Sequence, residues 1–141
     1  MPKDKKFITK DSGVRQDYPS GMRRDTQEGK PSYDLCYKPM YRRWAEIMER
    51  GAQKYGRNNW QNANSIEELE RFLGSLERHL MQFINATKHE ANQATENKHF
   101  QDVDLDAYED EKHEDHAAAI YFNVACAVYV LTRLMEDKDA E

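Results

Sequence analysis

The spacing of apolar residues along the chain predicts long helices separated by polar segments. From about Met40 to Tyr55, apolar side chains recur every three or four residues, which is the period of an amphipathic helix. Gly56 follows, and glycine is the residue type that most often ends a helix. We therefore expect a first helix over roughly residues 40–55.

A second helix is expected to begin at Ser65. Ser65 and Glu68 have the spacing of a capping box, in which each side chain bonds a free backbone N–H of the other residue's turn. An apolar series follows and ends near Thr87. The segment 88–104 is polar and without period, so we expect a long loop or a mobile lid there.

A third helix is expected from about Glu109 to Asp137. Between Ala117 and Leu131 it is apolar on every side, which is typical of a central, buried helix. The segment 102–116, which includes the start of this helix, is strongly acidic. The pattern predicts an all-α fold, with residues 1–19 as a flexible N-terminal arm and 20–141 as a single domain whose first part, to residue 39, is loop-like.

Composition narrows the class of protein. A chain of 141 residues fits one domain, and its net charge of −5 argues against a nucleic-acid partner. The longest apolar run, 117–131, contains Asn123 and is shorter than the roughly 20 residues of a membrane span. Two cysteines without a partner motif fit a reduced compartment. We expect a soluble, cytoplasmic protein with no membrane partner.

Two pairs of acids are candidates for binding a metal ion. Glu46 and Glu49 lie one helical turn apart and can share a hard divalent cation, although a solvated surface pair is the alternative because they lie opposite the apolar stripe. A second acidic helix or a neighbouring subunit would have to cover that face. Glu111 and Asp115 share a face at the start of the third helix, ahead of its buried stretch, where favourable interaction with the helix dipole is the competing explanation.

Cationic and aromatic residues near these acids suit a nucleotide. Arg24, Lys30 and Lys54 can make charge-assisted contacts with phosphates, Trp60 can stack on a base, and Asn59 can bond a base edge or the sugar. His116 and Asn123 share one stripe of the third helix. They either line a ligand pocket or are satisfied within the core, and His79 is either a ligand contact or a solvated or salt-bridged group.

Other chemistries fit poorly. The only Glu-x-x-His of the kind used in di-iron bundles, Glu96 to His99, lies in a segment without an apolar face. The cysteines are too isolated for a zinc site, and the glycine patterns of P-loop and Rossmann proteins are missing from the sequence. Metal-assisted phosphate chemistry on a helical scaffold remains.

Four segments follow one another along the chain: residues 20–35, residues 49–60, Arg78-His79-Leu80, and Asp115-His116 with Asn123. In this order they resemble the dATP/dGTP diphosphohydrolase family of phages and bacteria. The most specific is Lys-Tyr-Gly-x-x-Asn-Trp at 54–60.

The resemblance implies a fold and an activity. That family is similar to the MazG-like all-α pyrophosphohydrolases, whose helical bundle is completed by oligomerisation, so we expect a homo-oligomer, either a dimer or a tetramer. The expected substrate is dATP, dGTP or both, hydrolysed to the monophosphate and pyrophosphate, in the nucleotide metabolism of a phage with diaminopurine DNA. The alternative is a non-catalytic helical module that binds a nucleotide or a protein.

The resemblance also implies roles for the candidate residues. The cofactor would be Mg²⁺, with Mn²⁺ as a substitute, and its ligands would be Glu46, Glu49, Glu111 and Asp115. Catalysis would depend on Glu46, Glu49 and Asp115. Substrate binding would involve Arg24, Lys30, Lys54, Asn59, Trp60, His79, His116 and Asn123. The family's second Glu-x-x-Asp is not reproduced, because Asp115 comes one residue late, so Glu114 and Glu77 are alternative ligands.

Overall fold

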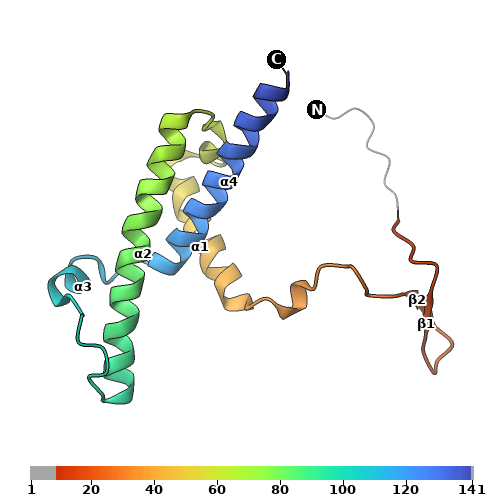
Figure 1. The fold of residues 1–141 in the computed structure, drawn as a ribbon, viewed down its shortest axis with the longest axis horizontal. Coiled ribbons are helices and arrows are strands. Elements are labelled where there is room, and N and C mark those ends of the chain that lie inside the picture. The colour runs from red at the N-terminus through yellow and green to blue at the C-terminus, as the bar shows by residue number, and fades with distance from the viewer. Residues whose placement is uncertain (1–8, 141) are drawn as a thin grey trace. The chain divides into compact units, whose positions relative to one another are not determined.

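The computed structural model describes residues 9–140, and these divide into two compact units, 9–36 and 37–140. The second unit is all-α, as expected, and contains the helices α1 (Lys38–Tyr55), α2 (Ile66–Thr95), α3 (Leu105–Glu111) and α4 (His116–Ala140) (Figure 1). A short 3-10 helix, η2 (Asn59–Asn62), joins α1 to α2.

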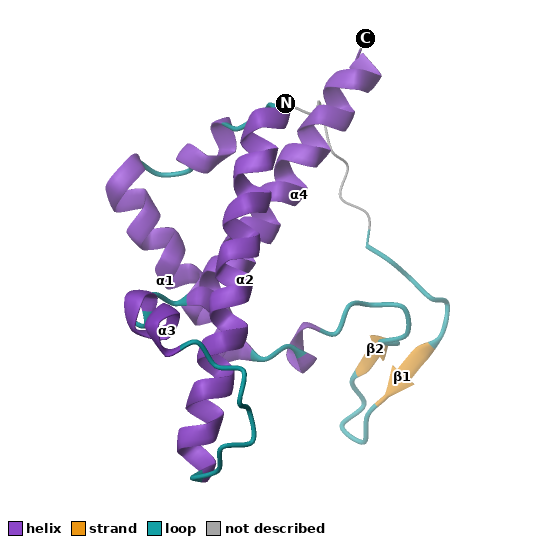
Figure 2. Cartoon of the chain, turned by 60° about the vertical axis from the view of Figure 1, so that its left-hand side comes forward, coloured by secondary structure: helices purple, strands orange, loops and turns teal. Residues whose placement is uncertain are grey.

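The N-terminal unit is a small hairpin that the sequence did not predict. Strands β1 (Arg15–Asp17) and β2 (Arg23–Asp25) pair antiparallel, and a 3-10 helix, η1 (Tyr33–Leu35), follows (Figure 2). Both strands consist of charged and polar residues, so the alternation of apolar and polar residues that marks a half-buried strand is missing. The hairpin crosses the boundary expected at residue 20. Residues 1–8 of the expected arm lie outside the described part of the chain.

The predicted ends of the first two helices are confirmed where local signals mark them. Gly56 adopts φ 94°, and its N–H donates to the carbonyl of Ala52 at 2.9 Å. At the start of α2, the Glu68 N–H donates to Ser65 Oγ at 3.2 Å, and the Glu68 carboxylate accepts from Ser65 and from the backbone of Asn64. This is the expected capping box.

The prediction of a loop over residues 88–104 is wrong for its first half, because α2 continues to Thr95. Two asparagine side chains of α2 bind the returning chain. Asn92, on this polar extension, exchanges two hydrogen bonds with the backbone of Phe100, and Asn85, just before the extension, exchanges two with that of Asp104. The side-chain amides therefore hold residues 96–104 on α2 without an apolar stripe.

The prediction of one continuous third helix is also wrong, since the chain turns between α3 and α4. An aspartate caps each helix: Asp104 accepts from the Ala107 N–H and Asp115 from the Ala118 N–H, both at 3.0 Å. Asp104 and Asp115, two acids of the acidic segment 102–116, are thus helix caps that satisfy backbone donors of the first turn.

Helix α4 packs against both α1 and α2, and α2 and α4 run antiparallel (Figure 1). The expectation that α4 is buried on every side is wrong for the single chain. One face is buried through Ala118, Asn123, Cys126 and Val130, whereas the other exposes large apolar side chains: Tyr121, Val124, Val128, Leu131 and Met135.

Within the described residues, α4 is also the one helix long and apolar enough to cross a membrane. Core helices of soluble proteins meet the same criteria of length and composition, so the observation is weak evidence for a span.

Candidate active site

A cavity of about 830 Å³ lies within the helical unit, bounded by α1, η2, α2 and α4. Aromatic side chains form much of its wall: Tyr41, Trp44, Tyr55, Trp60, Phe72 and Phe122. Its polar lining includes four residues that the sequence singled out, which are Glu49, Asn59, Trp60 and Asn123. Residues up to 82 positions apart in the chain, Tyr41 and Asn123, thus meet around one hollow of the size that small ligands occupy.

The loop after α1 positions Trp60 at this cavity. Gly56 ends the helix, Asn58 adopts a left-handed conformation with φ 61°, and η2 begins at once. Trp60 packs edge-to-face against Tyr129 of α4, with ring centroids 5.0 Å apart. The carbonyl of Gln61 accepts from Arg133 at 2.7 Å and from the Tyr129 hydroxyl at 3.2 Å. The most specific motif of the sequence therefore folds into a loop that is fastened to α4.

Asn123 lies on the α4 side of the cavity and is only 3% exposed. Its side-chain N–H group donates to the carbonyl of Ala119 at 2.8 Å, which satisfies one of its donors within the helix. Asn123 was expected either to be satisfied within the core or to line a ligand pocket. Each alternative holds in part, because its side chain is hydrogen-bonded within α4 and also borders the cavity.

The two glutamates of α1 differ in their surroundings. Glu46 accepts from Arg42 Nε at 3.2 Å, and its side chain is half exposed. Glu49 lines the cavity and forms no ion pair or side-chain hydrogen bond within residues 9–140. Two exposed carboxylates one turn apart fit a hard divalent cation.

The acids before α4 are paired with arginines instead. Asp115 accepts two hydrogen bonds from Arg43 of α1, at 2.8 and 2.6 Å, and these lower the pKa of Asp115 below its usual value. Glu111 is bound to Arg78 of α2. The four acids do not come together in one cluster in the described chain, so Glu111 and Asp115 fit a shared cation only if Arg43 and Arg78 release them.

The two histidines of the expected substrate contacts lie elsewhere. His79 and His116 are 7% and 6% exposed, face each other across the α2–α4 interface, and are not among the residues that line the cavity. Burial lowers the pKa of His79, and the positive charge of Arg78 lowers it further, although Glu111 opposes the shift. The geometry makes this pair part of the helix interface.

A family model described as dATP/dGTP diphosphohydrolase, N-terminal, matches residues 20–140. This chain belongs to the dATP/dGTP diphosphohydrolase family. It is accordingly a nucleoside triphosphate pyrophosphohydrolase. The curated proteins and the solved structures with which it was compared contain no match.

In this diphosphohydrolase, the remaining cationic candidates do not line the large cavity. Lys54 is exposed in the last turn of α1, where the helix dipole also stabilises a positive charge. Arg24 and Lys30 lie in the N-terminal unit and line a smaller hollow of about 430 Å³. Lys30 Nζ lies 3.7 Å from Asp25 there.

Several residues that line the cavity of the diphosphohydrolase were not predicted from the sequence. Arg57 and Arg71 contribute cationic lining, and Ser75 a hydroxyl. Arg71 and Ser75 lie outside the apolar stripe of α2, where polar residues are common on any surface helix. Their spacing of four residues puts them on one face, but only the packing of α1 and η2 shows that this face borders a hollow.

Proposed function

We propose that this diphosphohydrolase converts dATP, dGTP or both to the monophosphate and pyrophosphate in a reaction that requires Mg²⁺, for which Mn²⁺ can substitute. The observation that carries the proposal is the cavity of about 830 Å³, because it combines aromatic walls with the unpaired carboxylate of Glu49. The family match supports the substrate class.

The aromatic walls suit a purine base. A planar base can stack on an indole or phenyl ring, and the amides of Asn59 and Asn123 can bond its edge or the deoxyribose. A cavity of this size is in the range that small-molecule sites occupy. We assign the base and sugar to this hollow.

The triphosphate then needs positive charge near Glu49. Arg57 and Arg71 are the guanidinium groups of the cavity lining, and bidentate guanidinium contacts suit phosphate oxygens. Lys54, Arg24 and Lys30 remain phosphate-binding candidates on the strength of the sequence resemblance.

Glu46 and Glu49 would hold the cation. When bound, Mg²⁺ supplies charge that neutralises phosphate oxygens and favours ionisation of water. Glu111 and Asp115 would join only after exchange of their arginine partners, for which substrate phosphates are alternative acceptors. Water attacks the α-phosphorus, the bond to the bridging oxygen breaks, and pyrophosphate leaves, so no protein nucleophile is required.

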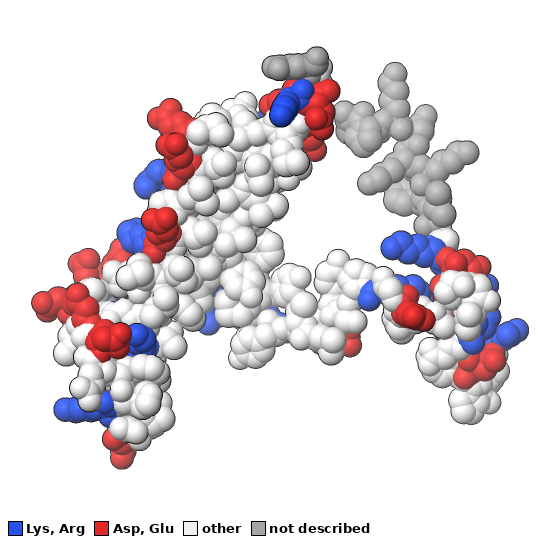
Figure 3. All heavy atoms as spheres, viewed as in Figure 1, with Lys and Arg blue, Asp and Glu red and all other residues white. Residues whose placement is uncertain are grey.

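A homo-oligomer, either a dimer or a tetramer, is part of the proposal. The view in Figure 3 shows a broad uncharged area over the helical unit, with acidic side chains gathered along its edge. The exposed large apolar side chains include Val128 and Leu131 on α4 and Leu80 and Met81 on α2. Covering them with a second copy would bury apolar area without any new partner. The proposal includes no membrane or nucleic-acid partner and a cytoplasmic location.

The biological setting that we propose is a phage whose DNA contains 2,6-diaminopurine. There, removal of dATP and conversion of dGTP to dGMP would both favour the modified base. In this setting the triphosphate of diaminopurine deoxyriboside should be spared. Discrimination against a 2,6-diamino base would depend on a few hydrogen bonds at the base edge.

The test is a panel of deoxynucleoside triphosphates, assayed by anion-exchange chromatography of the products with Mg²⁺, Mn²⁺ or EDTA. We expect dNMP and pyrophosphate from purine substrates with either metal, none with EDTA, and little product from pyrimidines. Release of single phosphates would contradict the reaction. Failure to turn over any triphosphate, together with no Mg²⁺ binding by calorimetry, would favour the non-catalytic helical module.

A further inference from the structure

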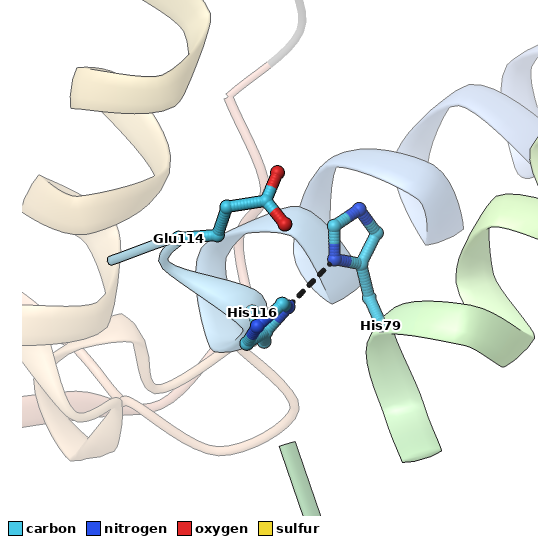
Figure 4. A group of neighbouring side chains, drawn as sticks. All are labelled: His79, Glu114 and His116. Carbon is cyan, nitrogen blue, oxygen red and sulfur yellow. Dashed lines mark hydrogen bonds between the residues drawn. The ribbon is translucent and has the colours of Figure 1, made fainter. Parts of the chain in front are cut away.

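Three side chains of types that can bind a metal ion meet where α2 passes the turn between α3 and α4 (Figure 4). They are His79, Glu114 and His116, and one nitrogen or oxygen of each lies within 4.8 Å of the others. Within the described residues this is the group of histidine, cysteine and acidic side chains compact enough to share an ion. It differs from the acids proposed for Mg²⁺ on α1.

We propose that His79, Glu114 and His116 form a separate binding site for a divalent transition-metal ion that favours imidazole nitrogen, such as Zn²⁺. Two imidazoles and one carboxylate are a ligand set that Zn²⁺ and Co²⁺ favour, whereas Mg²⁺ and Ca²⁺ favour oxygen alone. The ion would join α2 to the start of α4.

The separation of the two imidazoles suits chelation. His79 Nδ1 and His116 Nδ1 lie 2.9 Å apart. Two nitrogens at about 2.05 Å from one ion and at right angles to each other would lie about 2.9 Å apart, and a tetrahedral angle would need about 3.4 Å. A shift of a few tenths of an ångström therefore covers both geometries.

The turn before α4 presents Glu114 and His116 together. The Glu114 N–H donates to the carbonyl of Glu111, and the His116 N–H donates to the carbonyl of Glu114, both at 3.1 Å. His116 Nε2 lies 3.0 Å from the Glu111 carbonyl. Metal-binding imidazoles commonly donate their second N–H to such an acceptor, which leaves Nδ1 free for the ion.

The side chain of Glu111 supplies a second observation. Glu111 Oε2 is buried and has no hydrogen-bond partner among the described residues, although the other oxygen of that carboxylate binds Arg78. An unpaired, buried carboxylate oxygen is costly. A divalent ion beside it would offset that cost through its charge.

Arg78 is the group that opposes metal binding. Its Nη2 lies 3.1 Å from His79 Nε2, so in the metal-free arrangement it donates there, His79 donates from Nδ1 to His116, and His116 donates from Nε2 to the Glu111 carbonyl. Chelation requires the His79 proton to move from Nδ1 to Nε2 and Arg78 to give up its contact with His79. The number of protons on the pair is unchanged. Arg78 Nη1 also lies 3.7 Å from Glu114 Oε2, so the ion competes with Arg78 for that carboxylate as well.

The test is titration of the metal-stripped protein with Co²⁺, followed by visible absorption, and with Zn²⁺, followed by calorimetry, in excess Mg²⁺. We expect one ion per chain, with loss of binding in His79→Gln and His116→Gln. Glu114→Gln should weaken it more than about tenfold. The neighbouring exposed residue supplies the matched control, His113→Gln, and Glu49→Gln is a second control; both should bind as the wild type does.

Failure of the wild type to bind either ion, or unchanged binding in Glu114→Gln and His116→Gln, would overturn the proposal. Glu114 has a half-exposed side chain, so its variant remains decisive if a histidine variant is shown by circular dichroism to be unfolded. Because the readout is metal binding without nucleotide, the result is independent of the proposed hydrolysis. Inactivity of the enzyme would leave this site intact, and loss of the site would leave the pyrophosphohydrolase proposal intact.

Discussion

At the level of single residues, Glu49 is the acid that the structure connects most directly with chemistry. Of the acids proposed to bind metal, it is the one that lines the cavity and has no ion pair in the described chain. Glu46, Glu111 and Asp115 each have an arginine partner. The four carboxylates proposed as metal ligands therefore differ in whether an arginine already pairs with them.

Glu49→Gln should lower kcat by about 100-fold or more while leaving the fold unchanged, because it removes one negative charge and keeps the side-chain volume. Steady-state assays with dGTP and circular dichroism would measure both effects. The matched control is Glu70→Gln, an exposed glutamate of α2 outside the cavity, which should retain full activity. Activity of Glu49→Gln equal to that of the control would remove Glu49 from the site.

The two cysteines should differ sharply in reactivity. Burial raises the pKa of the Cys126 thiol to about 12, so almost none of it is thiolate at neutral pH, whereas Cys36 is exposed. We expect one thiol per chain to react with a disulfide reagent in the native protein and both after denaturation. In Cys36→Ser the native protein should be unreactive, and rapid labelling of this variant would show that α4 opens readily.

At the level of elements, the start of α2 depends on its capping box. Ser65→Ala removes the acceptor for the Glu68 N–H and should lower the free energy of unfolding by about 1 kcal/mol. Ser65→Thr retains the hydroxyl and should cost less. Urea unfolding followed by circular dichroism measures both, and equal stabilities of the two variants would show that the cap contributes nothing.

The segment 96–104 should be held on α2 by side-chain amides. Asn92→Ala removes both bonds to the Phe100 backbone, and we expect faster tryptic cleavage after Lys98, since local opening exposes the bond. Gln93→Ala, at the next, exposed position, is the matched control. A cleavage rate equal to that of the control would mean that other contacts hold this segment.

At the level of the whole molecule, the exposed apolar face of α4 should determine the oligomeric state. Val128 is 58% exposed at the middle of that face. Val128→Lys places a charge where a second copy would pack, so it should shift the protein to monomers in sedimentation-velocity experiments. Glu70→Lys, on the charged surface, should not. A monomeric wild type would contradict the proposed oligomer directly.

The fold was predictable from the sequence where its signals are local. A capping box, a glycine after an apolar stripe and a period of three to four residues depend on neighbours within one or two turns, and they located both ends of α1 and the start of α2. The extension of α2 and the break before α4 were missed, because Asn92 and Asn85 act on backbone that returns later in the chain. The charged hairpin lacks the apolar alternation that would have revealed it.

The candidate site was predictable in part for the same reason. The motif at 54–60 and Asn123 were found by residue type and resemblance, and Asn59, Trp60 and Asn123 do line the cavity with Glu49. Arg71 and Ser75 carried no signal of their own.

By itself, the sequence determined that the domain is helical, where the first helix ends and the second begins, and which family the chain resembles, because local backbone preferences and short motifs carry that information. Only the tertiary structure decided which charged side chains form ion pairs and which do not. Arg43 and Asp115 are 72 residues apart in the chain, yet their side chains bond. His79 and His116 likewise become a pair only when α2 and α4 pack. Such pairings depend on distances between helices, which no local pattern encodes.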